Sequence, residues 1–67
     1  SNNKQDTKTP TEEQIRNYAA DVACFPIDET TTYSVLHEHG TRYGVLTTGD
    51  DCLQCWLMAT GEVYGEW

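Results

Sequence analysis

The spacing of apolar residues changes once along this chain, at Pro26, and this change constrains the fold more than any other feature. Before Pro26, apolar residues recur every three or four positions, which is the pattern of one helical face. They are Ile15, Tyr18, Ala19 and Val22. After Pro26, short stretches alternate between apolar and polar residues and are rich in β-branched and aromatic side chains, as strands are. The sequence therefore predicts an α+β fold that begins with its helix.

The predicted helix has a recognisable start and end. Thr9 can accept a hydrogen bond from an amide of the first turn, and Glu12 can reach back to the Thr9 N–H. Pro10 fits the first turn, where a missing N–H costs nothing. Pro26 should end the helix, because its ring biases Phe25 away from helical geometry.

Four strands are predicted after the loop at residues 26–29. They cover residues 31–38, 42–48, 53–59 and 62–67, and turns at 39–41, 49–51 and 60–61 separate them. Turns this short join antiparallel neighbours. The expected fold is an N-terminal amphipathic helix packed on a three- to four-stranded antiparallel β-meander. Residues 1–8 are all polar, so we expect a disordered tail before a single acidic domain at residues 9–67.

Both faces of the predicted sheet carry large apolar side chains, yet one short helix can cover only one face. The other face should present a contiguous apolar patch, which usually marks a protein interface. The side chains expected there are a combination of Leu36, Leu46, Trp56, Met58 and Tyr64. The expected acidic rim consists of Glu38, Asp50, Asp51, Glu62 and Glu66. The alternative is a strongly curled sheet, or a second face covered by the loop at residues 26–30 and the tail.

The charge balance separates the classes of partner. The net charge is −7, and Arg16 and Arg42 are the only cationic side chains from residue 11 onward. Nucleic acids and anionic membranes attract Lys and Arg, so we expect neither as a direct partner. A basic protein surface would be attracted. Three cysteines, a polar start without an apolar signal core and no membrane-length apolar stretch predict a cytoplasmic protein.

The pairs His37/His39 and Cys52/Cys55 form a candidate zinc site. Histidines two positions apart project from the same side of a strand, and Cys-x-x-Cys is a common zinc-knuckle spacing. Zinc would also stabilise a domain this small. A strand through both cysteines, however, would direct them to opposite faces, in which case Cys55 is a core residue.

Few residues offer catalytic chemistry. The sequence has no glycine-rich phosphate loop and no serine nucleophile motif, and Asp50 and Asp51 fit a hairpin turn. We expect no enzyme activity and no required cofactor. The leading expectation is a small protein-binding module, an inhibitor or regulator of a basic partner, comparable in size and charge with inhibitors that phages or plasmids encode. The alternatives are a homodimer through the same face, a structural zinc domain, and a DNA mimic that inhibits a nucleic-acid-binding protein.

Overall fold

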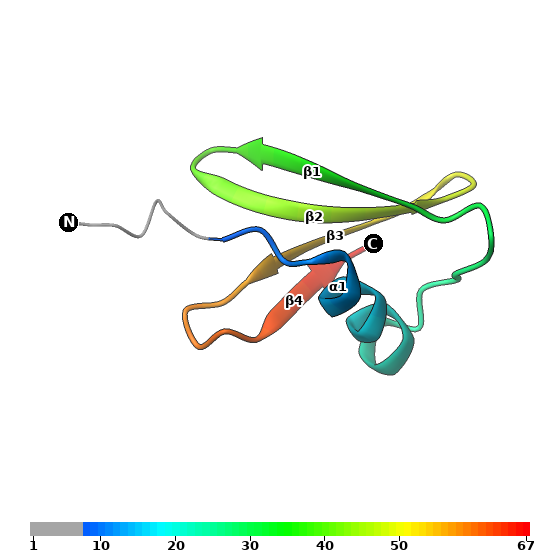
Figure 1. Cartoon of the computed structure of the whole chain (residues 1–67), viewed down its shortest axis with the longest axis horizontal. Helices are drawn as coiled ribbons and strands as arrows, with labels where there is room; N and C mark the ends of the chain where they lie inside the picture. Colours follow the sequence, from blue (N-terminus) through cyan, green and yellow to red (C-terminus); the bar gives the residue numbers. More distant parts are fainter. Residues whose placement is uncertain (1–7) are drawn as a thin grey trace.

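The computed structural model describes residues 8–67 and confirms the α+β fold, with a helix on one side of an antiparallel sheet (Figure 1). The helix α1 spans Glu12–Tyr18 and continues into a π-helical turn, η2, at Ala19–Ala23. The strands are β1 (Thr32–Glu38), β2 (Thr41–Thr48), β3 (Asp51–Leu57) and β4 (Val63–Glu66), and they pair in this order as an antiparallel meander. β1, β2 and β4 begin and end within one residue of their predicted positions, whereas β3 lies two residues earlier than predicted. The predicted tail falls almost wholly outside the described residues.

The helix begins at a capping box two residues later than predicted. The Gln14 N–H donates to Thr11 Oγ1 at 3.1 Å, and the Thr11 N–H donates to Gln14 Oε1 at 2.8 Å. Thr9, the predicted cap, therefore precedes the helix. Pro10 is buried ahead of the cap, where its carbonyl accepts a hydrogen bond of 2.9 Å from the Tyr33 hydroxyl.

The helix ends in a turn that is wider than an α-helical turn. In η2 the Cys24 N–H donates to the carbonyl of Ala19, five residues back instead of four. The extra residue changes which side chains face the sheet, so that Ala23 packs against the core. Val22, predicted on the apolar face, is 64% exposed. Cys24 has a left-handed φ of 55° and ends the helix before Pro26 is reached.

The core lies between the helical layer and one face of the sheet, named the covered face here. Directly opposed residues of antiparallel strands project to the same side, so the pairs Tyr33↔Leu46 and Leu46↔Leu53 identify this face. Its buried apolar members, with those of the helical layer, are Ile15, Ala19, Phe25, Leu46, Leu53 and Cys55.

Two glycines allow the helical layer to approach the covered face closely. A Cβ at Gly44 would lie 3.1 Å from the carbonyl oxygen of Pro10. A Cβ at Gly65 would lie 2.6 Å from Cys55 Sγ and 3.1 Å from the Tyr18 ring. Both positions therefore need a residue without a side chain at this packing distance.

Two hydrogen bonds connect the helical layer to the last strand and the residue that follows it. The Tyr18 hydroxyl donates to the carbonyl of Gly65 at 3.4 Å, and the Trp67 indole N–H donates to the carbonyl of Ala23 at 3.2 Å. The Trp67 ring also meets Phe25 edge to face, with centroids 5.0 Å apart. The helical layer and the residues around β4 thus enclose the core together.

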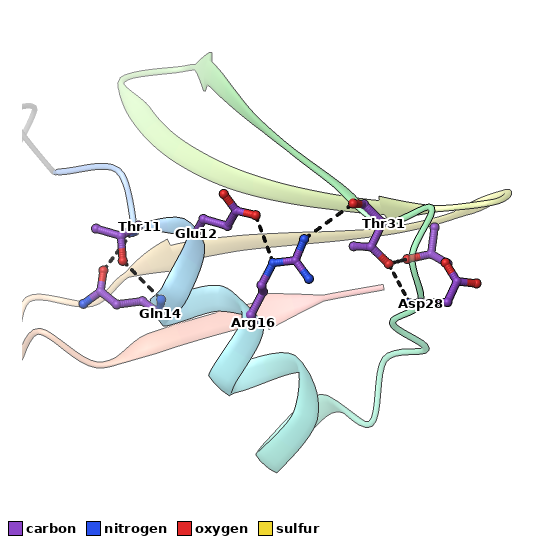
Figure 2. A network of polar contacts seen from close by, with 7 residues as sticks. Thr11, Glu12, Gln14, Arg16, Asp28 and Thr31 are labelled. Carbon is purple, nitrogen blue, oxygen red and sulfur yellow. Dashed lines mark hydrogen bonds and ion pairs between the residues drawn. The ribbon is translucent and has the colours of Figure 1, made fainter.

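A polar network holds the loop before β1 against the helix and the end of the sheet (Figure 2). Arg16 forms an ion pair of 2.9 Å with Glu12 and donates to the carbonyl of Thr31 at 3.5 Å. Thr31 Oγ1 accepts from the Asp28 N–H at 2.9 Å and lies 2.6 Å from Thr48 Oγ1. The loop therefore passes around the end of the sheet and does not fold over its second face (Figure 1).

Candidate protein-binding face

The second face of the sheet, named the open face here, carries a row of four large side chains. The register places Leu36 opposite Tyr43 and Trp56 opposite Tyr64. The neighbouring pair Gly44↔Cys55 places Tyr43 opposite Trp56, so one row crosses all four strands. The helical layer of α1 and η2 lies on the covered side of the sheet (Figure 1). The register places this row on the opposite side.

The three aromatic rings of the row pack against each other. Tyr43 and Trp56 have centroids 5.8 Å apart and planes at 84°, and Trp56 and Tyr64 have centroids 5.2 Å apart and planes at 65°. Each edge-to-face pair contributes about 0.5–1.5 kcal/mol beyond the burial of its area. Tyr64 is 51% exposed, whereas Leu36, Tyr43 and Trp56 are partly buried. The contacts give the row a defined shape before any partner binds.

Two more apolar side chains extend the row along the strands. Met58 directly follows β3, where its N–H donates to the carbonyl of Glu62 at 2.7 Å, and it is 46% exposed. Val45 lies two residues from Tyr43 on the same face of β2 and is buried. The set is named the open-face patch and consists of Leu36, Tyr43, Val45, Trp56, Met58 and Tyr64.

Three of the five predicted rim carboxylates border this patch. Glu38, Glu62 and Glu66 are exposed. Alternation along the strands places all three on the open side, with Glu62 beside Met58. The patch therefore has acidic groups near both edges of the sheet.

Asp50 and Asp51 lie outside the rim. They are exposed at the turn between β2 and β3, about 20 Å along β2 from Tyr43. Asp51 pairs with Thr48, whose side chain belongs to the covered face. These two carboxylates add to the charge of the molecule but do not surround the patch.

Leu46 does not belong to the open face, so its inclusion among the candidate binding residues is corrected. It is opposite Tyr33 and Leu53 on the covered face and has no exposed surface. Its apolar character alone fits either face, because both faces are apolar.

Tyr43 and Val45 belong to the open-face patch but were missing from the predicted set. The signal that identifies them is the turn at His39 and Gly40, which both have positive φ, as in a two-residue type I′ hairpin. A two-residue turn fixes the register, which puts Tyr43 opposite Leu36.

The structure does not bring the two histidines and two cysteines of the zinc hypothesis together. His37 and His39 lie at the β1–β2 turn, whereas Cys52 lies near the β2–β3 turn, about 17 Å away along β2. Cys55 is buried on the covered face, where burial raises the pKa of its thiol to about 11. Within residues 8–67, no group of three or more His, Cys, Asp and Glu side chains could hold a metal ion.

The chain matches no family model, no curated protein and no solved structure. None of the helices in residues 8–67 has the length and apolar character that crossing a membrane requires.

Proposed function

We propose that this chain is a small protein-binding module that docks a basic protein partner through the open-face patch and inhibits or regulates it by occupation. The observation that supports this most is the row of Leu36, Tyr43, Trp56 and Tyr64 on the side of the sheet opposite the helix. Tyr, Trp and Met are enriched in the cores of interfaces, and Trp and Tyr dominate binding hot spots.

The charge of the molecule supports a basic partner. The chain carries a net charge of −7, and Glu38, Glu62 and Glu66 border the patch. Carboxylates around an apolar centre accelerate encounter with a positive surface and lose this effect as salt screens them. The three thiols of the chain are free, which fits binding in the reducing cytoplasm.

The same charge pattern favours a protein-binding patch over a DNA mimic. A mimic needs carboxylates at regular spacing along one surface, as phosphates are spaced along a duplex. Here Asp50 and Asp51 lie at the end of the sheet formed by the β2–β3 turn, Glu38 and Glu62 lie at the opposite end, and Glu66 lies between them. An apolar centre with an acidic border is the anatomy of an ordinary protein interface.

A matched pair of variants tests the proposal. Tyr64→Ser shortens a side chain of the open face that is 51% exposed, and Ile27→Ser shortens a side chain of the loop before β1 that is 38% exposed. Proteins captured on the immobilised wild-type chain are identified, purified and titrated against all three chains. We expect Tyr64→Ser to weaken binding by about 2 kcal/mol, or roughly thirtyfold, and Ile27→Ser to leave it unchanged.

Salt provides a second arm of the same experiment. Raising NaCl from about 0.05 M to about 0.5 M should weaken binding of a basic partner, mainly through its association rate. A purified partner that binds Tyr64→Ser as tightly as the wild type would exclude the open face. An affinity that does not change with salt would exclude the role of the acidic border.

A further inference from the structure

The two edges of the sheet are protected differently. β4 has four residues and lies beside the helical layer, where the Tyr18 hydroxyl donates to the carbonyl of Gly65. Residues of α1 and η2 line a shallow depression together with the residues at 62–64. β1 has seven residues and forms the opposite edge, away from α1 (Figure 1). An edge strand presents backbone N–H and C=O groups with which another chain can pair.

The turn at the end of β1 determines which of its backbone groups face outward. His39 and Gly40 have φ of 53° and 79°, so Glu38 and Thr41 form the hydrogen-bonded closing pair of a two-residue hairpin. Bonded and non-bonded pairs then alternate along the antiparallel ladder. The outward N–H and C=O groups of β1 are those of Tyr33, Val35 and His37.

β1 carries few of the features that normally protect an edge. Residues 32–38 contain no proline and no lysine, and pairing with β2 continues through all seven residues without a bulge. Val35, at the centre of the strand, is 57% exposed. A long edge with an exposed apolar residue at its centre is a template for pairing with a further strand.

We propose that two copies of this chain pair through β1, antiparallel and centred on Val35, to form one eight-stranded sheet. In this register the apolar centre of the strand meets its own copy. Going outward from Val35, Ser34 is opposite the second copy's Leu36, Tyr33 opposite its His37, and Thr32 opposite its Glu38. Each Glu38 therefore faces a threonine and not another carboxylate, so the strand is complementary to itself.

The contact is closed and symmetric. A two-fold axis perpendicular to the sheet passes between the two Val35 residues, so each copy makes the same contacts as the other. Both helices then lie on one side of the eight-stranded sheet, and both open-face patches lie on the other. The dimer leaves the open-face patch accessible, so it does not depend on the proposed function.

Salt affects the two proposals in opposite directions. Each copy carries a net charge of −7, so two copies repel each other at long range. Added salt screens this repulsion and should strengthen the dimer, whereas it should weaken binding of a basic partner. A failure of one proposal can therefore be distinguished from a failure of the other.

Analytical ultracentrifugation of the full chain over a series of concentrations and two salt concentrations tests the dimer. We expect the mass to rise from one chain to two, and to do so at lower protein concentration in high salt. Val35→Lys places a charge at the centre of the junction and should abolish the dimer. Val22→Lys makes the same change at a valine that is 64% exposed, against 57% for Val35, and should retain it.

Hydrogen exchange measured by NMR tests the same junction without any substitution. The amides of Tyr33, Val35 and His37 should become protected as concentration rises, whereas those of Ser34 and Leu36, which face β2, should be protected throughout. Circular dichroism confirms that both lysine variants are folded before they are compared.

Four results would overturn the β1 dimer. They are a single-chain mass at every concentration, a dimer that survives Val35→Lys, outward amides whose exchange does not depend on concentration, and a dimer that Tyr64→Ser removes but Val35→Lys does not. The last result would place the second copy on the open face.

Discussion

Burial divides the three thiols of this chain into two kinds. Cys24 and Cys52 are exposed, whereas Cys55 lies beneath the helical layer with no exposed surface. Burial raises the pKa of the Cys55 thiol to about 11, because a thiolate there would lose its hydration. The nucleophile in thiol chemistry is the thiolate, so Cys55 is both inaccessible and in its unreactive form at neutral pH.

Alkylation with iodoacetamide at about pH 8 should therefore modify two cysteines quickly in the native chain. The third should react only after unfolding in denaturant, and peptide mapping should identify it as Cys55. Equal rates at all three cysteines in the folded chain would contradict the placement of Cys55 in the core.

The raised pKa of Cys55 also makes stability depend on pH in the alkaline range. The thiol ionises near pH 9 when exposed and near pH 11 in the fold, so between these values the unfolded state binds fewer protons than the native state. The stabilisation from Cys55 is complete below pH 9. As the pH rises to 11 it is lost, and the free energy of unfolding falls by about 2–3 kcal/mol. Urea unfolding of the wild type and of Cys55→Ala measures it, because the variant should lack this part of the decline.

The start of α1 could not be predicted from local signals. Thr9 and Thr11 both have a residue three positions later that can complete a capping box, Glu12 for one and Gln14 for the other. The Thr11 box leaves Pro10 outside the helix, where its carbonyl accepts a hydrogen bond from Tyr33. A contact with a distant strand thus decides between two caps that are equivalent in sequence.

Replacing each threonine by alanine tests which one caps the helix. Thr11→Ala removes the acceptor of the Gln14 N–H and should lower the free energy of unfolding by about 1 kcal/mol. Thr9→Ala should cost less than half of that, because Thr9 lies outside the capping box. Thermal or urea unfolding compares the two, and a larger loss from Thr9→Ala would reverse the assignment.

The strands were predictable and the end of the helix was not, for physical reasons that differ. Alternation and tight turns are encoded within each strand and its neighbour, so β1 to β4 lie close to where the pattern put them. The wide turn of η2 has no such local signature. This turn places Ala23, and not Val22, on the buried side of the helix. An apolar repeat of 3.6 residues assumes a regular α-helix and cannot indicate this change.

At the scale of the whole molecule, the row of residues beneath the helix explains which face became the covered one. Gly44, Cys55 and Gly65 are opposite one another on three neighbouring strands, so the centre of this face carries only small side chains. The adjacent row on the other face is that of Tyr43, Trp56 and Tyr64, which is bulky. A helix packs more closely over small side chains than over large ones.

This contrast also shows why the candidate site was only partly predictable. Counting apolar residues indicates correctly that one helix cannot cover both faces, but it treats Leu46 and Trp56 alike. Distinguishing them requires the register, which depends on the hairpin turns, and the glycine positions, which depend on what packs above them. Leu46 is consequently core, whereas Trp56 lies on the open face.

The contacts between the helical layer and the end of the sheet have a consequence for biosynthesis. Tyr18 and Gly65 are 47 positions apart, and Ala23 and Trp67 are 44 apart, so the helical layer rests on residues that are synthesised much later. Such distant contacts cannot form while the later residues are still inside the ribosome. The apolar side of the helix therefore stays uncovered, and accessible to chaperones, until Trp67 has left the exit tunnel.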